Sequence, residues 1–345
     1  MKKLKVIQIG IQHEHATGKM NTLRKMEDIF EVAGYVDDRS FSRTSVYLAN
    51  EDLQAWPWPY SGLREFTLEE ALNYPGLDAV LVEVPNNDLA EIALLCMKKG
   101  IAMHVDKPGG EDPARFKELV DGCKAANIPF QIGYMYRGNP AMNFCRKLVH
   151  TGILGDILEI EMDMSHNYGG ERYQHYLSGF KGGVMYNLGC HNFDFIISLL
   201  GRPDNVTPFL KNVQGTLPGT INNSLAVLEY PNTLVTVRVN AHKAWGSPLR
   251  RLSVNGNNGC FILSPHERFD GHELTAELFL KEDRGEYKAG INPLTFGRQQ
   301  DRYIDQLTEF AQVIRGEVTP SYSYEHEYLV HEVTLAASGC TKWSK

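Results

Sequence analysis

The alternation of apolar strand patterns with helical patterns in the first third of the chain most constrains its fold. The patterns follow one another as a strand at 4–10, a helix at 16–26, strands at 30–38 and 77–85, a helix at 88–100 and a strand at 101–108. The first strand pattern ends at Gly10 and the second helical pattern ends at Gly100. Strands that are joined through helices run parallel, so this order predicts an α/β fold in which helices cover both faces of a parallel sheet.

The pattern changes near residue 134. A helix that begins after Asp112 and a short strand complete the first part of the chain. Longer strands with alternating polar and apolar residues follow, at 156–165, 224–231, 233–242 and 251–256, with helices at 139–152, 301–316 and 324–339. This change predicts two domains, residues 1–133 and residues 134–345, of which the second is an α+β domain with an open, mostly antiparallel sheet.

Composition excludes several classes of protein. The chain has 345 residues, a formal net charge of −7 and six cysteines that lie far apart in the sequence. The negative charge disfavours a nucleic-acid surface, and the scattered cysteines favour reduced thiols over a zinc site or a disulfide framework. The first apolar run is too short and polar for a signal peptide, and no segment is long enough for a membrane span. We therefore expect a cytoplasmic protein whose partners are small molecules or further copies of the chain.

The turn after the first strand is a candidate dinucleotide site. Gly10 has the first position of a glycine-rich turn that brings a pyrophosphate to backbone amides, whereas Gln12 and His15 replace the second and third glycines. We expect the amides to bind the phosphates with help from Gln12 or His13. His13 and His15 could also bind a metal ion, but the spacing offers no third ligand, so we predict no metal.

Asp37 ends the second strand at about the distance from the turn where a carboxylate binds the adenosine ribose. Its charge would repel a 2′-phosphate and therefore favours NAD over NADP. Arg39 keeps NADP possible, because a guanidinium group binds phosphate. The alternative is that Asp37 and Asp38 only cap the next helix.

Four motifs occur in the order and spacing of a known family. They are VEVPNN at 82–87, GIAMHVDKPGG at 100–110, IGYMYRGNPAM at 132–142 with HTGILGDI at 150–157, and KGGVMYNLGCHNFDFIISLLG at 181–201. With these motifs the chain resembles the Gfo/Idh/MocA oxidoreductases, named after glucose-fructose oxidoreductase and inositol dehydrogenase. The resemblance covers nearly the whole chain. It implies a doubly wound Rossmann domain followed by a domain for substrate binding and oligomerisation.

The resemblance also implies roles for residues of the first domain. Lys107 corresponds to the active-site lysine of the family, and Asp106 before it replaces a glutamate. Pro85 and Asn86 correspond to residues that line the cofactor. We therefore expect NAD, or NADP as the second choice, to contact these four residues.

In the second domain the resemblance points to Asn187 and His191. His191 corresponds to the family's histidine and is the candidate base, while Lys107 is the candidate cation that polarises the substrate oxygen. We expect both side chains to meet over one nicotinamide ring. Asn187 replaces the family's aspartate, so it can exchange hydrogen bonds with a substrate hydroxyl but cannot accept a proton.

Three further residues are candidates for substrate binding. They are Arg137, Tyr168 and His175, in segments rich in hydroxyl, imidazole and aromatic groups that carbohydrate sites use for orientation. The alternative is that Tyr168 and His175 belong to an ordinary surface loop.

Three functions remain open. The first is an NAD(P)-dependent dehydrogenase that transfers hydride between the nicotinamide and a secondary hydroxyl of a sugar, a polyol or a derivative. The second is a glycoside hydrolase or lyase that uses NAD for transient oxidation without net redox change. The third is a homologue that binds the cofactor without catalysis. The resemblance further implies a homodimer or homotetramer and a role in carbohydrate metabolism.

Overall fold

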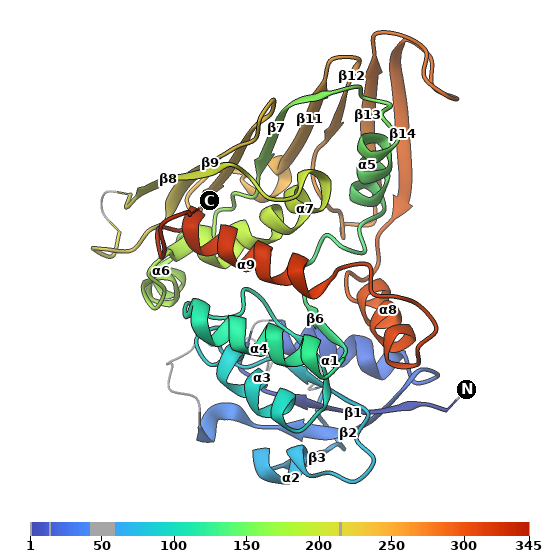
Figure 1. Cartoon of the computed structure of the whole chain (residues 1–345). Coiled ribbons are helices and arrows are strands. Elements are labelled where there is room, and N and C mark those ends of the chain that lie inside the picture. The colour runs from blue at the N-terminus through green and yellow to red at the C-terminus, as the bar shows by residue number, and fades with distance from the viewer. Residues whose placement is uncertain (1, 14, 42–58, 214–215, 345) are drawn as a thin grey trace. The chain divides into compact units, whose positions relative to one another are not determined.

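The computed structural model describes residues 2–13, 15–41, 59–213 and 216–344 (Figure 1). The chain divides into two compact units. The first unit comprises Met1–Tyr134 with Tyr303–His331, and the second comprises Met135–Arg302 with Glu332–Lys345. Within the described ranges no helix combines the length and the apolar character that crossing a lipid bilayer requires.

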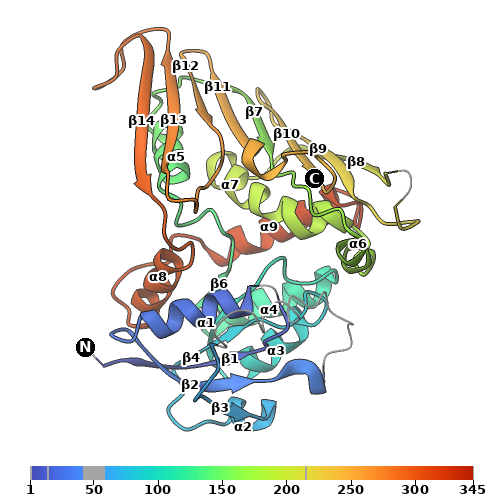
Figure 2. The same cartoon turned by 180° about the vertical axis from the view of Figure 1, so that it is seen from behind.

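The first unit is built on a six-stranded parallel sheet. Its elements are β1 (Leu4–Ile9), α1 (Ala16–Lys25), β2 (Phe30–Val36), a short 3₁₀ turn (Asp38–Ser40), β3 (Arg64–Phe66), α2 (Leu68–Leu72), β4 (Ala79–Val82), α3 (Leu89–Lys98), β5 (Ala102–Val105), α4 (Pro113–Ala125), β6 (Phe130–Ile132) and α8 (Ile304–Ile314). The strand order is β3-β2-β1-β4-β5-β6, and every pairing is parallel. Helices α3 and α4 cover one face, and α1 and α8 cover the other (Figures 1 and 2).

Local sequence signals account for the start of helix α4. Asp112 precedes it in extended conformation, and its side chain accepts the backbone N–H groups of Ala114 and Arg115. Pro113 at the first helical position loses no hydrogen bond there, because that N–H has no partner within a helix. The cap that the sequence predicts is therefore present.

The second unit contains an eight-stranded sheet. Its elements are α5 (Pro140–His150), β7 (Ile157–Asp163), α6 (Glu171–Ser178), a π-helical turn (Met185–Gly189), α7 (Cys190–Leu200), β8 (Asn205–Lys211), β9 (Asn223–Glu229), β10 (Leu234–Asn240), a 3₁₀ turn (Ser247–Leu249), β11 (Arg251–Gly256), β12 (Gly259–Leu263), β13 (Glu273–Leu280) and β14 (Gly290–Arg298). The strand order is β14-β13-β12-β11-β7-β10-β9-β8, and only β7 and β10 pair in parallel. The predicted fold class is confirmed in both units.

Helices α5 and α7 lie on one face of the second sheet, which is seen from the helix side in Figure 1 and from the opposite side in Figure 2. Their buried side chains include Met142 and Leu148 of α5 and Phe193 and Ile197 of α7. On strands β9, β10 and β13 every second residue is buried. The alternating pattern of the sequence is therefore the pattern of a sheet with one covered face.

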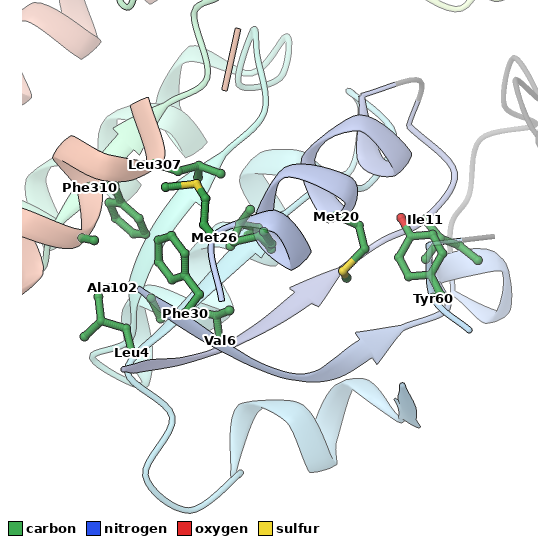
Figure 3. Close-up of a cluster of buried hydrophobic side chains, with 14 residues drawn as sticks. Leu4, Val6, Ile11, Met20, Met26, Phe30, Tyr60, Ala102, Leu307 and Phe310 are labelled. Atoms are coloured by element: carbon green, nitrogen blue, oxygen red, sulfur yellow. The ribbon is translucent and has the colours of Figure 1, made fainter. Parts of the chain in front are cut away.

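The last part of the chain departs from the predicted domain limits. The sequence analysis assigned residues 134–345 to the second domain, but residues 303–331 belong to the first unit. Leu307 and Phe310 of α8 pack in one apolar cluster with Leu4, Val6 and Phe30 (Figure 3). The periodicity of the sequence predicts which face of a helix is apolar. It does not predict which sheet that face covers. Helix α9 (Tyr324–Ala337) spans the limit between the two units.

The packing of α8 leads to a stability test. Phe310 is 2% exposed, so Phe310→Ala is expected to lower the free energy of unfolding by about 3–5 kcal/mol, because it leaves a cavity between α8 and the sheet. Urea unfolding followed by circular dichroism measures the change. The control is Phe209→Ala in β8, where the side chain is 52% exposed and the expected change is about 0.5 kcal/mol or less. Equal effects of the two variants would contradict the packing.

Candidate functional site

Gly10 allows the end of β1 to approach the end of β4. It adopts a φ of +102°, and a Cβ atom at this position would lie 2.5–2.6 Å from the backbone of Glu83 and Val84. Both the dihedral angle and the contact exclude a side chain. The turn that follows therefore begins directly beside the two residues after β4.

The amide after Gly10 already has a partner within the chain. The backbone N–H of Ile11 donates to Asp38 Oδ1 at 3.0 Å, and the side chain of Gln12 also hydrogen-bonds to Asp38. Burial raises the pKa of Asp38, although the Ile11 N–H acts to lower it. Asp38 therefore holds the turn through hydrogen bonds to Ile11 and Gln12. A phosphate would have to bind donors other than the Ile11 amide. Sequence analysis considered Asp38 only as a helix cap.

Asp37 takes the capping position at the end of β2. Its Oδ1 accepts the backbone N–H of Arg39 at 3.0 Å and the Nε–H of the same residue at 2.9 Å. The capping alternative is thus present in the structure. Ribose binding by Asp37 stays a prediction, and the guanidinium group of Arg39 is paired with this carboxylate.

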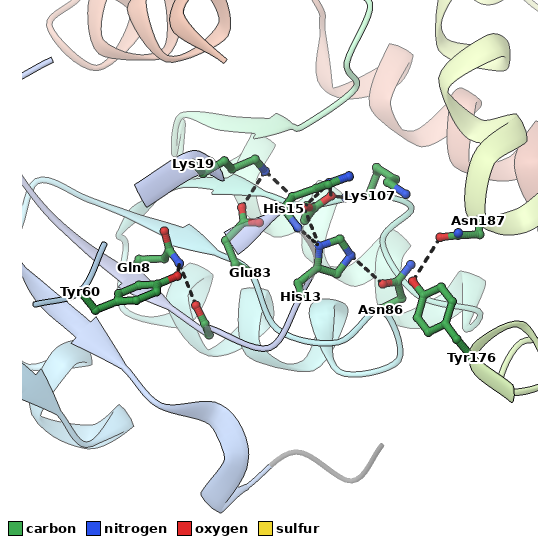
Figure 4. A network of polar contacts seen from close by, with 12 residues as sticks. Gln8, His13, His15, Lys19, Tyr60, Glu83, Asn86, Lys107, Tyr176 and Asn187 are labelled. Atoms are coloured by element: carbon green, nitrogen blue, oxygen red, sulfur yellow. Dashed lines mark hydrogen bonds and ion pairs between the residues drawn. The ribbon is translucent and has the colours of Figure 1, made fainter. Parts of the chain in front are cut away.

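A buried carboxylate at the end of β5 connects the turn with the neighbouring strands. Asp106 Oδ2 lies 3.1 Å from His13 Nδ1, 2.9 Å from His15 Nδ1 and 3.4 Å from Lys19 Nζ (Figure 4). Lys19 Nζ lies closer to Glu83 Oε1, at 2.6 Å. These side chains follow β1, β4 and β5, whose carboxyl ends share one edge of the sheet. His15 and Asp106, two positions where the sequence departs from the family's motifs, are in direct contact.

The charges in this cluster follow from burial and from the partners. Burial would raise the pKa of Asp106, but the neighbouring His13, Lys19 and His15 hold it well below its usual range. Burial raises the pKa of Glu83 well above its usual range, and the charge of Asp106 adds to this effect. Burial lowers the pKa of His15 to about 4, although Asp106 acts to raise it. At neutral pH the cluster therefore holds an ionised Asp106, a neutral His15 and the Lys19 ammonium.

The remaining predicted cofactor residues lie around the same carboxylate. The backbone N–H of Lys107 donates to Asp106 Oδ1 at 2.6 Å, and the Lys107 side chain is buried. Asn86 Oδ1 lies 2.9 Å from His13 Nε2, and the carbonyl of Pro85 accepts the N–H of Asp88 at 2.8 Å. The structure thus brings together most of the residues that sequence analysis selected in the first unit.

In the second unit, Asn187 and His191 have separate partners. Asn187 Oδ1 accepts the Tyr176 hydroxyl at 3.3 Å, and its Nδ2 donates to the Tyr173 hydroxyl at 3.2 Å. His191 Nδ1 accepts the backbone N–H of Met135 at 3.2 Å. The neutral imidazole therefore carries its proton on Nε2 and is a hydrogen-bond donor at that atom. This contact opposes the predicted role of His191 as a base, because a second proton on Nδ1 would break it.

A chain of aromatic side chains extends from Asn187. The Tyr173 hydroxyl lies 3.2 Å from His166 Nε2, and His166 Nδ1 accepts the backbone N–H of Tyr168 at 3.0 Å. The rings of His166 and Tyr168 stack with their centroids 4.1 Å apart. Burial lowers the pKa of His166 to about 3. Sequence analysis selected Tyr168 but missed Tyr173, for which the aromatic-rich segment around α6 was the available signal.

Two of the predicted substrate residues have other surroundings. Arg137 forms a buried ion pair with Asp194, with Nη2 at 2.6 Å from Oδ1. His175 is exposed on α6, 3.9 Å from Glu171. Substrate binding by Arg137 or His175 stays a prediction that these contacts do not favour.

The buried cluster of the first unit predicts a strong effect of Lys19→Met. Removal of the ammonium leaves buried carboxyl groups without their partner, which is expected to cost about 3–5 kcal/mol of unfolding free energy. The folded-state pKa values of Glu83 and Asp106 then rise, so the loss should be larger at about pH 8 than at about pH 5. Urea unfolding at both pH values measures the loss of unfolding free energy. As a control, Lys117→Met removes an exposed ion pair to Asp121, and a loss as large as that of Lys19→Met would refute this account.

Comparison with known proteins shows what the chain is similar to. Residues 142–262 match the family model described as the GFO/IDH/MocA C-terminal domain. The uncharacterised oxidoreductase YhhX of Escherichia coli (strain K12) is 25% identical over 289 residues, which cover 76% of this chain and 78% of that protein. The 2,7-anhydro-N-acetylneuraminate hydratase of the same organism is 27% identical over 205 residues, 55% of this chain and 52% of that enzyme.

A solved structure shows the same fold along almost the whole chain. Levoglucosan dehydrogenase, in complex with NADH and levoglucosan, superposes with a TM-score of 0.78 at 16% identity, covering 99% of this chain and 98% of that protein. The fold, the matched C-terminal domain and the four sequence motifs agree with one another. Residues 142–262 are thus similar to the C-terminal domain of the GFO/IDH/MocA family, and the chain as a whole has the fold of levoglucosan dehydrogenase.

Proposed function

We propose that the chain is an oxidoreductase that transfers hydride between a nicotinamide cofactor, NAD rather than NADP, and a secondary hydroxyl group of a sugar, polyol or derivative. The observation that carries the proposal is the convergence of the Gly10 turn, Asn86, Asp106 and Lys107 at the carboxyl edge of the parallel sheet. In open α/β sheets this edge is where ligands bind. The fold of the NADH-bound levoglucosan dehydrogenase supports the same assignment.

The residues of the first unit fit a dinucleotide with one restriction. The close approach of Gly10 to β4 preserves the backbone shape of a phosphate-binding turn, and Gln12 and His13 could supply polar atoms beside it. The amide of Ile11 is occupied by Asp38, so the diphosphate would depend more on side chains than in a glycine-rich turn. Asp37 would accept the ribose hydroxyls, and Pro85 and Asn86 would line the cofactor. When bound, the nicotinamide supplies the hydride donor or acceptor.

The proposed chemistry assigns donors to the substrate oxygen. Lys107 provides an ammonium group, His191 provides Nε2–H, and Asn187 provides an amide that its two tyrosine partners hold in place. Such donors stabilise negative charge that develops on the oxygen during hydride transfer. Because the Met135 contact keeps the proton of His191 on Nε2, we propose that His191 orients and stabilises this oxygen as a donor.

Cofactor preference is the first test of the function. Isothermal titration should show NADH binding at least about tenfold tighter than NADPH, because Asp37 repels the 2′-phosphate. Asp37→Ala should reduce this ratio towards one, whereas Asp28→Ala, which removes an exposed carboxylate before β2, should leave it unchanged. The dinucleotide assignment fails if neither cofactor binds to the folded protein.

Turnover is the second test. A panel of sugars and polyols is assayed with NAD by the absorbance of the reduced nicotinamide. With an active substrate, Lys107→Met and His191→Gln should each lower kcat by about 10²–10³, since each removes one donor to the reacting oxygen. Lys117→Met and His272→Gln, at exposed positions, serve as matched controls. Unchanged turnover in the folded Lys107 and His191 variants would favour the non-catalytic homologue.

A second candidate is a hydrolase or lyase that oxidises a sugar carbon transiently and reduces it again. Two observations favour keeping it: Asn187 replaces the family's aspartate, and one relative is named as a hydratase of an anhydro sugar acid. This candidate requires NAD for product formation but yields no net NADH. Product analysis beside the absorbance trace separates the two candidates.

Assembly and location belong to the same proposal. We infer a homodimer or homotetramer from the resemblance to the family, and a sugar or polyol as the small-molecule partner. A cytoplasmic location stays a prediction from the sequence.

A further inference from the structure

Three potential metal ligands converge in the first unit. They are His13 Nδ1, His15 Nδ1 and an oxygen of Asp106, and these atoms all lie within 4.8 Å of one another. Sequence analysis found two imidazoles but no third ligand, because Asp106 lies 91 residues beyond His15. We propose that His13, His15 and Asp106 form a binding site for a divalent transition-metal ion of the zinc type. The inference goes beyond the proposed function and does not depend on it.

The distances suit such an ion after small movements. Zinc binds imidazole nitrogen and carboxylate oxygen at about 2.0–2.2 Å, which in a tetrahedral arrangement separates neighbouring ligand atoms by about 3.3 Å. In the structure Asp106 Oδ2 lies 3.1 Å from His13 Nδ1 and 2.9 Å from His15 Nδ1. An ion therefore requires each imidazole nitrogen to move from Asp106 Oδ2 by only a few tenths of an ångström, and the two imidazole nitrogens lie within 4.8 Å of each other.

The orientation of His13 also suits a ligand. Its Nε2 lies 2.9 Å from Asn86 Oδ1, and in the tautomer in which Nε2 donates to this oxygen the lone pair is on Nδ1. A hydrogen bond from the distal nitrogen of a metal-bound histidine to an oxygen acceptor is the usual arrangement around such ions. The Nδ1 atom now accepts the backbone N–H of His15 at 3.2 Å, and the ion would replace this donor.

The charges of the cluster permit a further cation. Lys19 Nζ lies 3.4 Å from Asp106 Oδ2, but its closer partner is Glu83 Oε1, at 2.6 Å. Asp106 supplies an ionised ligand, and the two histidines can bind as neutral ligands beside the ammonium groups of Lys19 and Lys107. Three protein ligands leave a coordination position for water or for an oxygen of a second molecule, which the ion would polarise.

Direct metal binding tests the proposal. The chelator-treated full chain is titrated without NAD, with Zn²⁺ by calorimetry and with Co²⁺ by visible absorption. We expect one ion per chain with a dissociation constant at or below about 10⁻⁶ M, equivalent to about 8 kcal/mol, and a Co²⁺ spectrum of low coordination number. Mg²⁺ should not compete, because it prefers oxygen ligands. Absence of Zn²⁺ and Co²⁺ binding by the folded wild-type chain overturns the proposal.

Variants identify the ligands. His15→Ala, in a side chain that is 17% exposed, His13→Ala and Asp106→Asn should each weaken Zn²⁺ binding by at least tenfold, and Asn86→Ala should weaken it by about 10–100-fold through the orientation of His13. The surface variant His272→Ala is the control. Circular dichroism verifies that each variant folds. If the folded His15→Ala variant binds Zn²⁺ and gives the Co²⁺ spectrum as the wild type does, the site is not the one proposed. Because no nicotinamide is present, this outcome is separate from failure of the cofactor assignment.

Discussion

The first unit depends on one buried carboxylate with several partners. Asp106 is fully buried, and an isolated charge in such a position would be expensive. Its oxygens receive the Lys107 amide and face two imidazoles and the Lys19 ammonium. These groups come from segments after β1, within α1 and after β5. The carboxylate thus connects the turn, the first helix and the segment of Lys107, and any ligand at this edge would depend on their relative positions.

The sequence was sufficient for the class of each sheet and for most elements of the first unit. In the second unit it did not predict α6, β8, β12, β13 or β14. Continuous apolar strands joined by helices allow few arrangements, and alternating strands indicate a sheet with one covered face. Strand β3 and helix α2 were not predicted, because three-residue and five-residue elements have almost no periodicity. The position of α8 could not be predicted either, since its apolar face would suit either sheet.

The candidate site was predictable in part for similar reasons. Motifs placed Gly10, Asn86 and Lys107 at strand ends, and parallel strands bring such ends to one edge. The contacts of Asp106 with His13 and His15 depend on side-chain directions in a turn, where no periodic rule applies. In the second unit, the pairing of Arg137 with Asp194 and the contact of His191 with Met135 are tertiary hydrogen bonds between residues 57 and 56 positions apart. No local pattern in the sequence reports them.

The return of residues 303–331 to the first unit affects the order in which the protein can be completed during synthesis. The second unit's sheet ends at Arg298, so all its strands leave the ribosome before α8 does. Until then the apolar surface around Leu4, Met26 and Phe30 lacks Leu307 and Phe310. The first unit is therefore synthesised first, but its apolar core is completed only after the strands of the second unit have been made. Until then its apolar side chains stay exposed.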